Sequence, residues 1–269
     1  MKRKTYSNHF LAITLCILLA TMSGYAQQTD NDFMPRSGQA GKDVVWVPTP
    51  QALVDTMLSM ANVTSADFVM DLGSGDGRLV ITAAKRGATA LGIEYNPNMV
   101  ALARRAAMEE GVSERATFEQ ADIFETDFSK ATVVTLFLLT DLNLKLRPII
   151  LDMKPGTRVV SNTFSMSGWE PDQTKQIPED TSWRTAHLWI VPAKVDGVWK
   201  FDSGQINFKQ QFQFITGTLT MGGEDKELTG KLNGDKINFN AGGTEFVGTV
   251  SGNMISGNRS DGSSWNATR

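Results

Sequence analysis

Hydrophobic and polar residues follow two different periods along the chain, and the period changes near residue 202. Between about residues 50 and 200, short apolar runs alternate with stretches in which apolar residues recur every three or four positions. This order predicts an α/β fold in which helices cover both faces of a mostly parallel sheet. After residue 202 the helical period disappears, and Ile206, Phe208, Phe212 and Phe214 alternate with polar residues. The last part, 202–269, is therefore predicted to be a small all-β meander or barrel.

Apolar runs rich in β-branched residues mark the strands of the predicted sheet. The most apolar of them, 131–139, is expected to be a central parallel strand because both of its faces are hydrophobic. The segments 187–191 and 198–201 are expected to pair as the antiparallel hairpin that ends the sheet. The remaining predicted strands are 68–70, 90–94, 116–122 and 157–161.

Capping residues and prolines place the predicted helices. Thr49 is expected to cap a helix that begins at Pro50, and Asn96 to cap one with Pro97 at its first position. Asp141 is most simply the cap of a helix at 142–146, and Pro148 is expected to begin a separate helical turn.

A weak repeat marks the C-terminal part. Residues 230–237 align with 248–255 at a period of 18, and each copy places a turn between two apolar alternations. The turns are expected at Asn233-Gly234 and Ser251-Gly252, as between paired strands. No acid pair, histidine or basic-aromatic patch stands out here, so a structural role is favoured.

The first 26 residues are typical of a secretory signal peptide. Three basic residues precede the apolar stretch 10–20, and small residues at Gly24 and Ala26 fit cleavage after Ala26. An uncleaved membrane anchor is the alternative, and both interpretations place the rest of the chain in the periplasm or outside the cell. Residues 27–42 are polar without periodicity and are expected to form a flexible leader.

Cleavage would change the composition in a way that excludes several kinds of chemistry. It would leave 243 residues with no cysteine and one histidine, His187, and removing three basic residues from a net charge of −3 leaves −6. Disulfides, cysteine–histidine zinc sites and thiol catalysis are then excluded, and no metal site is expected. The acidic balance, without a run of lysine or arginine, argues against a nucleic-acid partner.

The stretch 69–78, Val-Met-Asp-Leu-Gly-Ser-Gly-Asp-Gly-Arg, carries the main chemical signal. An apolar strand ends at Asp71, and Gly73, Gly75 and Gly77 allow positive φ and the close approach of a ligand to the backbone. The helix that follows offers free N–H groups, so a nucleotide-type ligand is expected. The third glycine comes one position too early for the dinucleotide motif G-x-G-x-x-G. An ordinary tight turn between strand and helix is the simpler alternative.

Two acids at the ends of later strands favour the ligand site. Glu94 closes the second strand, 21 positions after Gly73, where folds of this kind place a carboxylate for ribose hydroxyls. Asp122 closes the third strand and is followed by Ile123. Because parallel strands end at the same edge of a sheet, the three signals should converge on one pocket.

The D-x-G-x-G-x-G stretch resembles motif I of the class I S-adenosylmethionine-dependent methyltransferases. The stretches 47–50, 71–78 and 135–139 are similar to a small bacterial and mitochondrial group whose mitochondrial members methylate protein lysines. The resemblance implies a Rossmann-like, seven-stranded methyltransferase domain over 43–201, with S-adenosyl-L-methionine as cofactor.

The resemblance also implies roles for residues. Asp71 with the glycine loop would hold the methionine end of the cofactor, Glu94 the ribose and Asp122 the adenine amino group, with Ile123 against the ring. The segment before the first helix would lie across the cofactor, and simple packing at the helix entry is the alternative for Trp46 and Pro48.

The acceptor implied by the resemblance is a protein side-chain amine, with a small molecule as the alternative. The sequence assigns no catalytic residue. An exported module that binds the cofactor or a nucleotide without turnover is the other interpretation of the same motifs.

Overall fold

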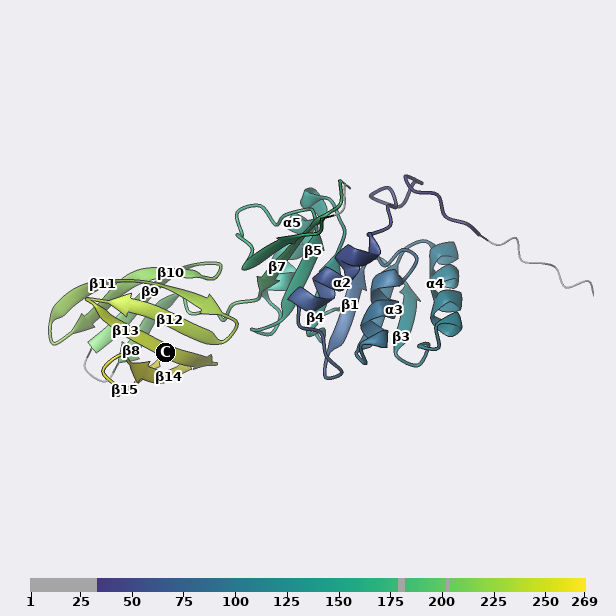
Figure 1. The fold of residues 1–269 in the computed structure, drawn as a ribbon. Coiled ribbons are helices and arrows are strands. Elements are labelled where there is room, and N and C mark those ends of the chain that lie inside the picture. Colours follow the sequence, from purple (N-terminus) through teal and green to yellow (C-terminus); the bar gives the residue numbers. More distant parts are fainter. Residues whose placement is uncertain (1–32, 179–181, 202–203) are drawn as a thin grey trace, which may run out of the picture. The chain divides into compact units, whose positions relative to one another are not determined.

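The computed structural model describes residues 33–178, 182–201 and 204–269 (Figure 1). The predicted signal peptide 1–26 and the leader up to residue 32 lie outside the described residues. Within these ranges, no helix combines the length and the apolar character that crossing a membrane requires. A compact unit begins at Pro35 and contains every helix and strand discussed below.

A seven-stranded mixed sheet forms the first part of this unit, as predicted. Its strand order is β3-β2-β1-β4-β5-β7-β6, in which β1 to β5 run parallel and β7 is antiparallel to both of its neighbours, β5 and β6. The apolar strand β4 lies in the centre, between β1 and β5, which confirms its predicted position. The strands are β1 Phe68–Leu72, β2 Thr89–Glu94, β3 Ala116–Gln120, β4 Val133–Leu136, β5 Arg158–Asn162, β6 Gln173–Gln176 and β7 Thr185–Ile190.

Two hydrophobic cores cover the two faces of the sheet because neighbouring strand residues point to opposite sides. Val69 packs with helices α2 Gln51–Met60, α3 Arg78–Lys85 and α4 Pro97–Glu109. Met70, the next residue, packs on the other face with α5 Thr140–Leu151. The sheet is therefore buried on both sides, as its apolar strands predict.

The helix starts agree with the sequence in one case and differ in another. At α4 the Asn96 side chain accepts a hydrogen bond from the Asn98 N–H at 2.9 Å, with Pro97 at the first helical position, which confirms the prediction. At α2 the predicted Thr49 cap is wrong, since Pro50 takes the cap position without a side-chain bond. The Thr49 hydroxyl instead accepts from the Asn162 side chain at 3.2 Å and joins the helix start to the end of β5.

Helix α5 also differs from the prediction. It continues through Pro148 instead of ending before it, and no side chain caps its start, so the expected Asp141 cap is wrong. Leu142, Leu146 and Ile150 are buried on one stripe that extends past the proline. Burial of this stripe outweighs the single hydrogen bond that proline removes.

The C-terminal part is a closed eight-stranded antiparallel barrel rather than an open meander. The predicted hairpin at the end of the sheet is wrong: β7 pairs with β5 and β6, whereas residues 197–201 pair with β9 and β15 in the barrel. The barrel order is β10-β11-β12-β13-β14-β15-β8-β9. Its strands are β8 Gly197–Phe201, β9 Gly204–Gln211, β10 Phe214–Met221, β11 Glu224–Asn233, β12 Lys236–Ala241, β13 Thr244–Ser251, β14 Met254–Arg259 and β15 Ser264–Thr268.

The internal repeat corresponds to two hairpins of the barrel. Asn233 pairs with Lys236 and Ser251 with Met254, so each copy has a two-residue connection that begins with a glycine at φ near +60°. Aromatic side chains fill the barrel interior, and the rings of Phe239 and Phe246 stack at 4.7 Å. The barrel therefore has a packed hydrophobic core of its own.

Candidate active site

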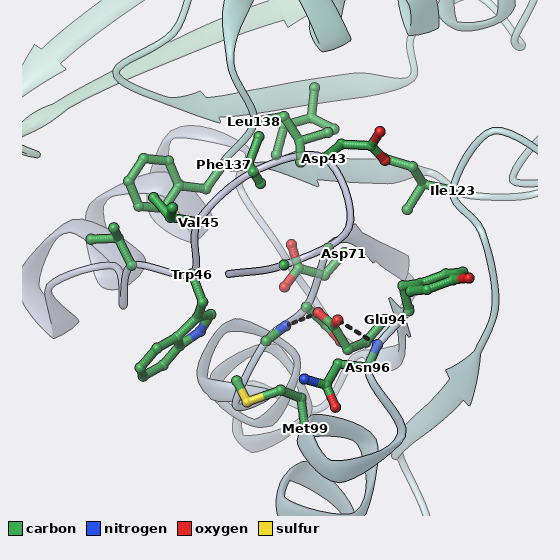
Figure 2. Close-up of a pocket in the computed structure, with 18 of the residues that line it drawn as sticks. Asp43, Val45, Trp46, Asp71, Glu94, Asn96, Met99, Ile123, Phe137 and Leu138 are labelled. Atoms are coloured by element: carbon green, nitrogen blue, oxygen red, sulfur yellow. Dashed lines mark hydrogen bonds between the residues drawn. The ribbon is translucent and has the colours of Figure 1, made fainter. Parts of the chain in front are cut away.

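A pocket opens at the carboxyl ends of β1, β2 and β4, where this class of fold binds its ligands (Figure 2). Six of the seven predicted site residues line it: Asp71, Gly73, Gly75, Glu94, Asp122 and Ile123. Gly77 does not. A Cβ at Gly77 would lie 2.6 Å from the Phe118 ring, so this glycine lets the loop pack closely on its neighbours.

The glycine loop is held against β2 by its own backbone. The N–H groups of Gly73 and Ser74 both donate to the Ile93 carbonyl, at 2.8 and 3.0 Å. Gly75 has φ +54°, and a Cβ there would lie 2.5 Å from the indole nitrogen of Trp46. At Gly75, both the backbone conformation and the lack of space therefore exclude a side chain, which leaves the loop backbone open to a ligand.

Glu94 is fixed at the end of β2 by two backbone donors. One carboxylate oxygen accepts from the Gly75 N–H and the other from the Asn96 N–H, each at 2.9 Å (Figure 2). A carboxylate oxygen has two acceptor sites, so each oxygen keeps one for a ligand hydroxyl. The residue is an oriented, half-buried acceptor suited to a pair of neighbouring hydroxyl groups.

Asp71 is a buried acid at the end of β1, with 6% of its surface exposed. Burial raises the pKa of its carboxyl to about 7, and the charges of Glu94 and Asp76 act in the same direction. A hydrogen bond from the Thr135 hydroxyl, at 2.7 Å, opposes the shift. A ligand ammonium nearby would favour the ionised form of Asp71.

Asp122 is paired with Lys42, a residue that the sequence interpretation placed in the flexible leader. Lys42 donates to one carboxylate oxygen and the Phe124 N–H donates to the other at 2.9 Å, and these bonds lower the pKa of Asp122. The Lys42 ammonium also lies 5.0 Å from the centroid of the Tyr95 ring. Lys42 is a site residue that nothing in its sequence surroundings indicated.

The segment before α2 is ordered over the pocket. The Gly38 N–H donates to the Trp46 carbonyl at 2.8 Å, and the Trp46 N–H donates to the Gln39 carbonyl at 2.9 Å. Residues 38–46 therefore form a short hairpin, so the end of the predicted leader, 38–42, is hydrogen-bonded rather than irregular. Trp46 and Pro48 both line the pocket.

Arg78 ties this hairpin segment to the glycine loop. Its guanidinium forms an ion pair with Asp76 at 2.5 Å and donates to the Thr49 carbonyl at 2.7 Å. Both partners lie beside the pocket. The bidentate contact with Asp76 orients the guanidinium, and the bond to Thr49 links the loop to the segment before α2.

Three aromatic side chains line the pocket on the side of β4 and β5. Phe137 follows β4, Phe164 follows β5 and Trp183 precedes β7. Their ring centroids lie 5.3 to 6.1 Å apart, so the rings contact one another. Sequence reasoning missed this cluster because its members come from three separate segments.

The described residues that line the pocket include no histidine or cysteine. His187 lies outside it on β7, where its Nδ1 is 3.0 Å from the Thr174 hydroxyl and burial lowers the pKa of the imidazole. In the described ranges, no group of three or more histidine, cysteine, aspartate or glutamate side chains is placed to hold a metal ion.

Comparison with known proteins identifies the family. Residues 71–173 match the family model described as the ANTKMT methyltransferase domain. A protein-lysine N-methyltransferase of Saccharolobus islandicus is 42% identical over 151 residues, which cover 55% of this chain and 94% of that protein. The chain belongs to the lysine-methyltransferase group of the class I methyltransferases.

Other relatives of this methyltransferase carry different acceptor names. The adenine nucleotide translocase lysine N-methyltransferase of Mus musculus is 33% identical over 130 residues, which cover 48% of this chain and 56% of that protein. A solved structure described as an RNA methyltransferase from Salinibacter ruber in complex with S-adenosyl-L-homocysteine is 48% identical. It aligns with a TM-score of 0.52 and covers 55% of this chain and 96% of its own.

The methyltransferase therefore uses S-adenosylmethionine, and its pocket fits that cofactor. A glycine cradle, an oriented acceptor for hydroxyl groups and two further acids converge on one cavity. The cofactor supplies a methyl group bound to a positively charged sulfur. When the acceptor nucleophile bonds to the methyl carbon, the carbon–sulfur bond breaks and the sulfur leaves as a neutral thioether.

Proposed function

We propose that this methyltransferase transfers the methyl group to the side-chain amine of a lysine in a protein. The charge of the pocket is the observation that carries the proposal. Five carboxylates line it, together with two cations, Lys42 and Arg78. Both cations are ion-paired with acids of the same lining, so the pocket favours a ligand that brings positive charge.

The cofactor would lie across the pocket in the order of the strand ends. Asp71 and the backbone of Gly73 and Gly75 would hold the methionine end, with the Asp71 carboxylate facing the ammonium. Glu94 would accept from the two ribose hydroxyls. Asp122 would accept from the adenine amino group, with Ile123 against the ring.

The acceptor amine has to arrive without its proton, since only a neutral amine has a lone pair to attack the methyl group. An apolar surrounding lowers the pKa of an amine because burial disfavours the charged form. The chain's contribution is then to hold the two reactants close and to exclude water, without a strong base. This agrees with a pocket lining that contains no histidine or cysteine among the described residues.

RNA is the second candidate acceptor, because the Salinibacter ruber structure, 48% identical, is described as an RNA methyltransferase. An RNA strand needs cations for its phosphates. Within the part of the chain that the structure describes, both cations of the pocket lining already have acidic partners. Charge therefore favours the amine over the phosphate-bearing acceptor.

Transfer of radiolabel from the cofactor tests the proposal. The full chain is incubated with labelled S-adenosylmethionine and a cell extract, beside a Glu94→Ala variant, and the products are separated by protease and ribonuclease treatment. We expect protease-sensitive label with the wild type and, at limiting cofactor concentration, at least about tenfold less label with the variant. Label in RNA or in small molecules would contradict the lysine acceptor, and cofactor binding without transfer would favour a binding module.

A further inference from the structure

We propose that Phe137, Phe164 and Trp183 form an acceptor wall, the surface against which the methylene chain of the acceptor lysine lies. The inference rests on the proposed lysine acceptor and names the residues that would recognise it. It assigns a specificity-determining role to a cluster that lies apart from the acids and glycines of the cofactor side.

The fold brings the three rings to one edge of the sheet. Strands β4 and β5 are parallel, so Phe137 and Phe164 follow their carboxyl ends at the same edge. Strand β7 is antiparallel to β5, so Trp183, just before β7, lies at that edge too. All three side chains line the pocket that also contains Asp71 and Glu94.

Contacts between the rings give the cluster a continuous surface. The Phe137 and Trp183 rings meet edge to face at 5.3 Å and 66°, and Trp183 meets Phe164 at 5.8 Å and 40°. Phe137 and Phe164 stack at 6.1 Å and 30°. Rings at these separations touch one another, so no group of ammonium size fits between them. The cluster is a wall on one side of the acceptor rather than a cage around it.

The wall continues to the cofactor side and to the mouth of the pocket. Leu138 follows Phe137 in the pocket lining (Figure 2). Its Cδ2 lies 3.3 Å from the position that a Cβ on Gly73 would take. Leu139 and Val45 also line the pocket and are 47% and 56% exposed. An apolar path therefore leads from solvent, past the rings, to the glycine loop.

A lysine side chain matches this path in chemistry. Its methylene groups would lie on the rings and Leu139, and its nitrogen would reach the interior end of the path beside Leu138. Apolar surroundings there favour the neutral amine that the transfer requires. A short polar acceptor or a phosphate-bearing one would gain little from such a surface.

The test uses two nitrogen analogues of S-adenosylmethionine in which nitrogen replaces the sulfur. The short analogue carries a methyl group on that nitrogen, and the long analogue carries an alkyl chain as long as a lysine side chain. Calorimetry on the full chain gives the ratio of their dissociation constants. We expect the long analogue to bind about tenfold more tightly to the wild type, because its methylenes leave water.

Single Phe137→Ala, Phe164→Ala and Trp183→Ala variants should each lower that ratio at least about threefold, while the affinity of the short analogue stays within about twofold. Trp183→Phe keeps a ring and should retain most of the ratio. Phe214→Ala is the matched control, since Phe214 is 41% exposed on the barrel and does not line the pocket. Three separate variants keep the test valid if one of them fails to fold.

A ratio near one in the wild type, or one that survives all three substitutions, would overturn the acceptor wall. The two proposals can fail separately. Labelled lysines together with a ratio near one would overturn the wall alone. A ratio that depends on the rings, together with label outside protein, would overturn the lysine acceptor.

Discussion

Asp71 and Glu94 lie in one pocket, yet their surroundings prepare them for different partners. Glu94 receives two backbone N–H groups and presents its remaining acceptor sites to the cavity. Asp71 is buried with one hydroxyl donor, and the pKa of its carboxyl rises to about 7. Glu94 is thus suited to neutral hydroxyl groups, whereas Asp71 is completed by a positively charged ligand group.

Replacing Glu94 with alanine should weaken cofactor binding by about 1.5–3 kcal/mol, the typical value of hydrogen bonds to a charged acceptor. This corresponds to roughly 10- to 150-fold in the dissociation constant for S-adenosylhomocysteine, measured by calorimetry. Glu119→Ala is the control because Glu119 is an exposed glutamate on the neighbouring strand β3. An equal loss in both variants would show that Glu94 has no specific role.

Cofactor affinity should depend on pH through Asp71. Its pKa in the ligand-free fold is about 7, so the carboxyl is increasingly protonated below that pH and cannot pair with the ligand ammonium. We expect calorimetry to show tighter binding of S-adenosylhomocysteine as the pH rises from about 6 to about 7.5. Asp71→Asn should bind more weakly and lose this dependence. The same pH slope in that variant would assign the titration to another group.

The same pKa shift affects the ligand-free fold in the opposite sense. The folded pKa of Asp71 lies above the unfolded value of about 3.9, so the folded protein keeps the proton to higher pH than the unfolded chain. The stability that this difference contributes is present at low pH and is lost as the pH rises through about 7. Near pH 7 and above, ionised Asp71 therefore strengthens ligand binding and lowers the stability of the ligand-free fold.

Single residues were predictable from the sequence where the signal is local. Asp71, Glu94 and Asp122 each follow an apolar strand, and strand ends of a parallel sheet meet at one edge, so their convergence needs no side-chain detail. Lys42 and Arg78 act through partners that depend on how the chain folds back over the loop. No pattern of spacing in the sequence carries that information.

At the scale of elements, the glycine loop and the hairpin 38–46 are built to fit each other. The indole of Trp46 fills the space where a side chain at Gly75 would stand. Arg78 then connects the helix after the loop to the carbonyl of Thr49, just beyond the hairpin. The hairpin 38–46 and the glycine loop are therefore held together by close packing, and a hydrogen bond from Arg78 ties the loop to the residue just beyond the hairpin.

Comparing Gly75→Ala with Gly111→Ala should separate the cost of the clash with Trp46 from the cost of backbone strain alone. It adds a Cβ 2.5 Å from the Trp46 indole at a φ of +54°, so we expect a destabilisation of about 2–4 kcal/mol and a clear loss of cofactor affinity. Gly111→Ala is matched in backbone, with φ +69° and open space around the position, and should cost only about 1–2 kcal/mol. Chemical denaturation and calorimetry measure both effects. Equal losses of stability in the two variants would contradict the close packing of Trp46 against Gly75.

Helices and strands were predicted well where the hydrophobic pattern along the sequence is clear. They were predicted poorly where contacts between distant segments determine strand pairing or helix length. The apolar strand β4 was placed in the centre of the sheet from composition alone. Residues 197–201 alternate like any strand, but their partners β9 and β15 are set by closure of the barrel. Likewise, burial of Leu146 and Ile150 carries α5 through Pro148, which local rules would have used as a break.

At the scale of the whole molecule, the barrel has a hydrophobic core separate from the two cores of the sheet. Phe239→Ala removes a fully buried ring from the barrel and should destabilise it by about 3–5 kcal/mol. Hydrogen exchange should then accelerate across 204–269, while the affinity for S-adenosylhomocysteine stays within about twofold. Phe128→Ala, a buried ring of the sheet core, is the matched control and should lower that affinity. Loss of binding in Phe239→Ala would show that the barrel supports the site.

The central claim, methyl transfer to lysine from the pocket of Asp71 and Glu94, is tested most directly by locating the transferred group. The full chain is incubated with S-adenosylmethionine that carries a deuterated methyl group and with protein from a cell extract, and tandem mass spectrometry of the digested protein locates the deuterium. At a cofactor concentration below the wild-type dissociation constant, the account predicts deuterated methyl groups on lysine Nζ with the wild type and roughly 10- to 150-fold less labelling with Glu94→Ala. Deuterium on other atoms only, or equal lysine labelling by the variant, would contradict it.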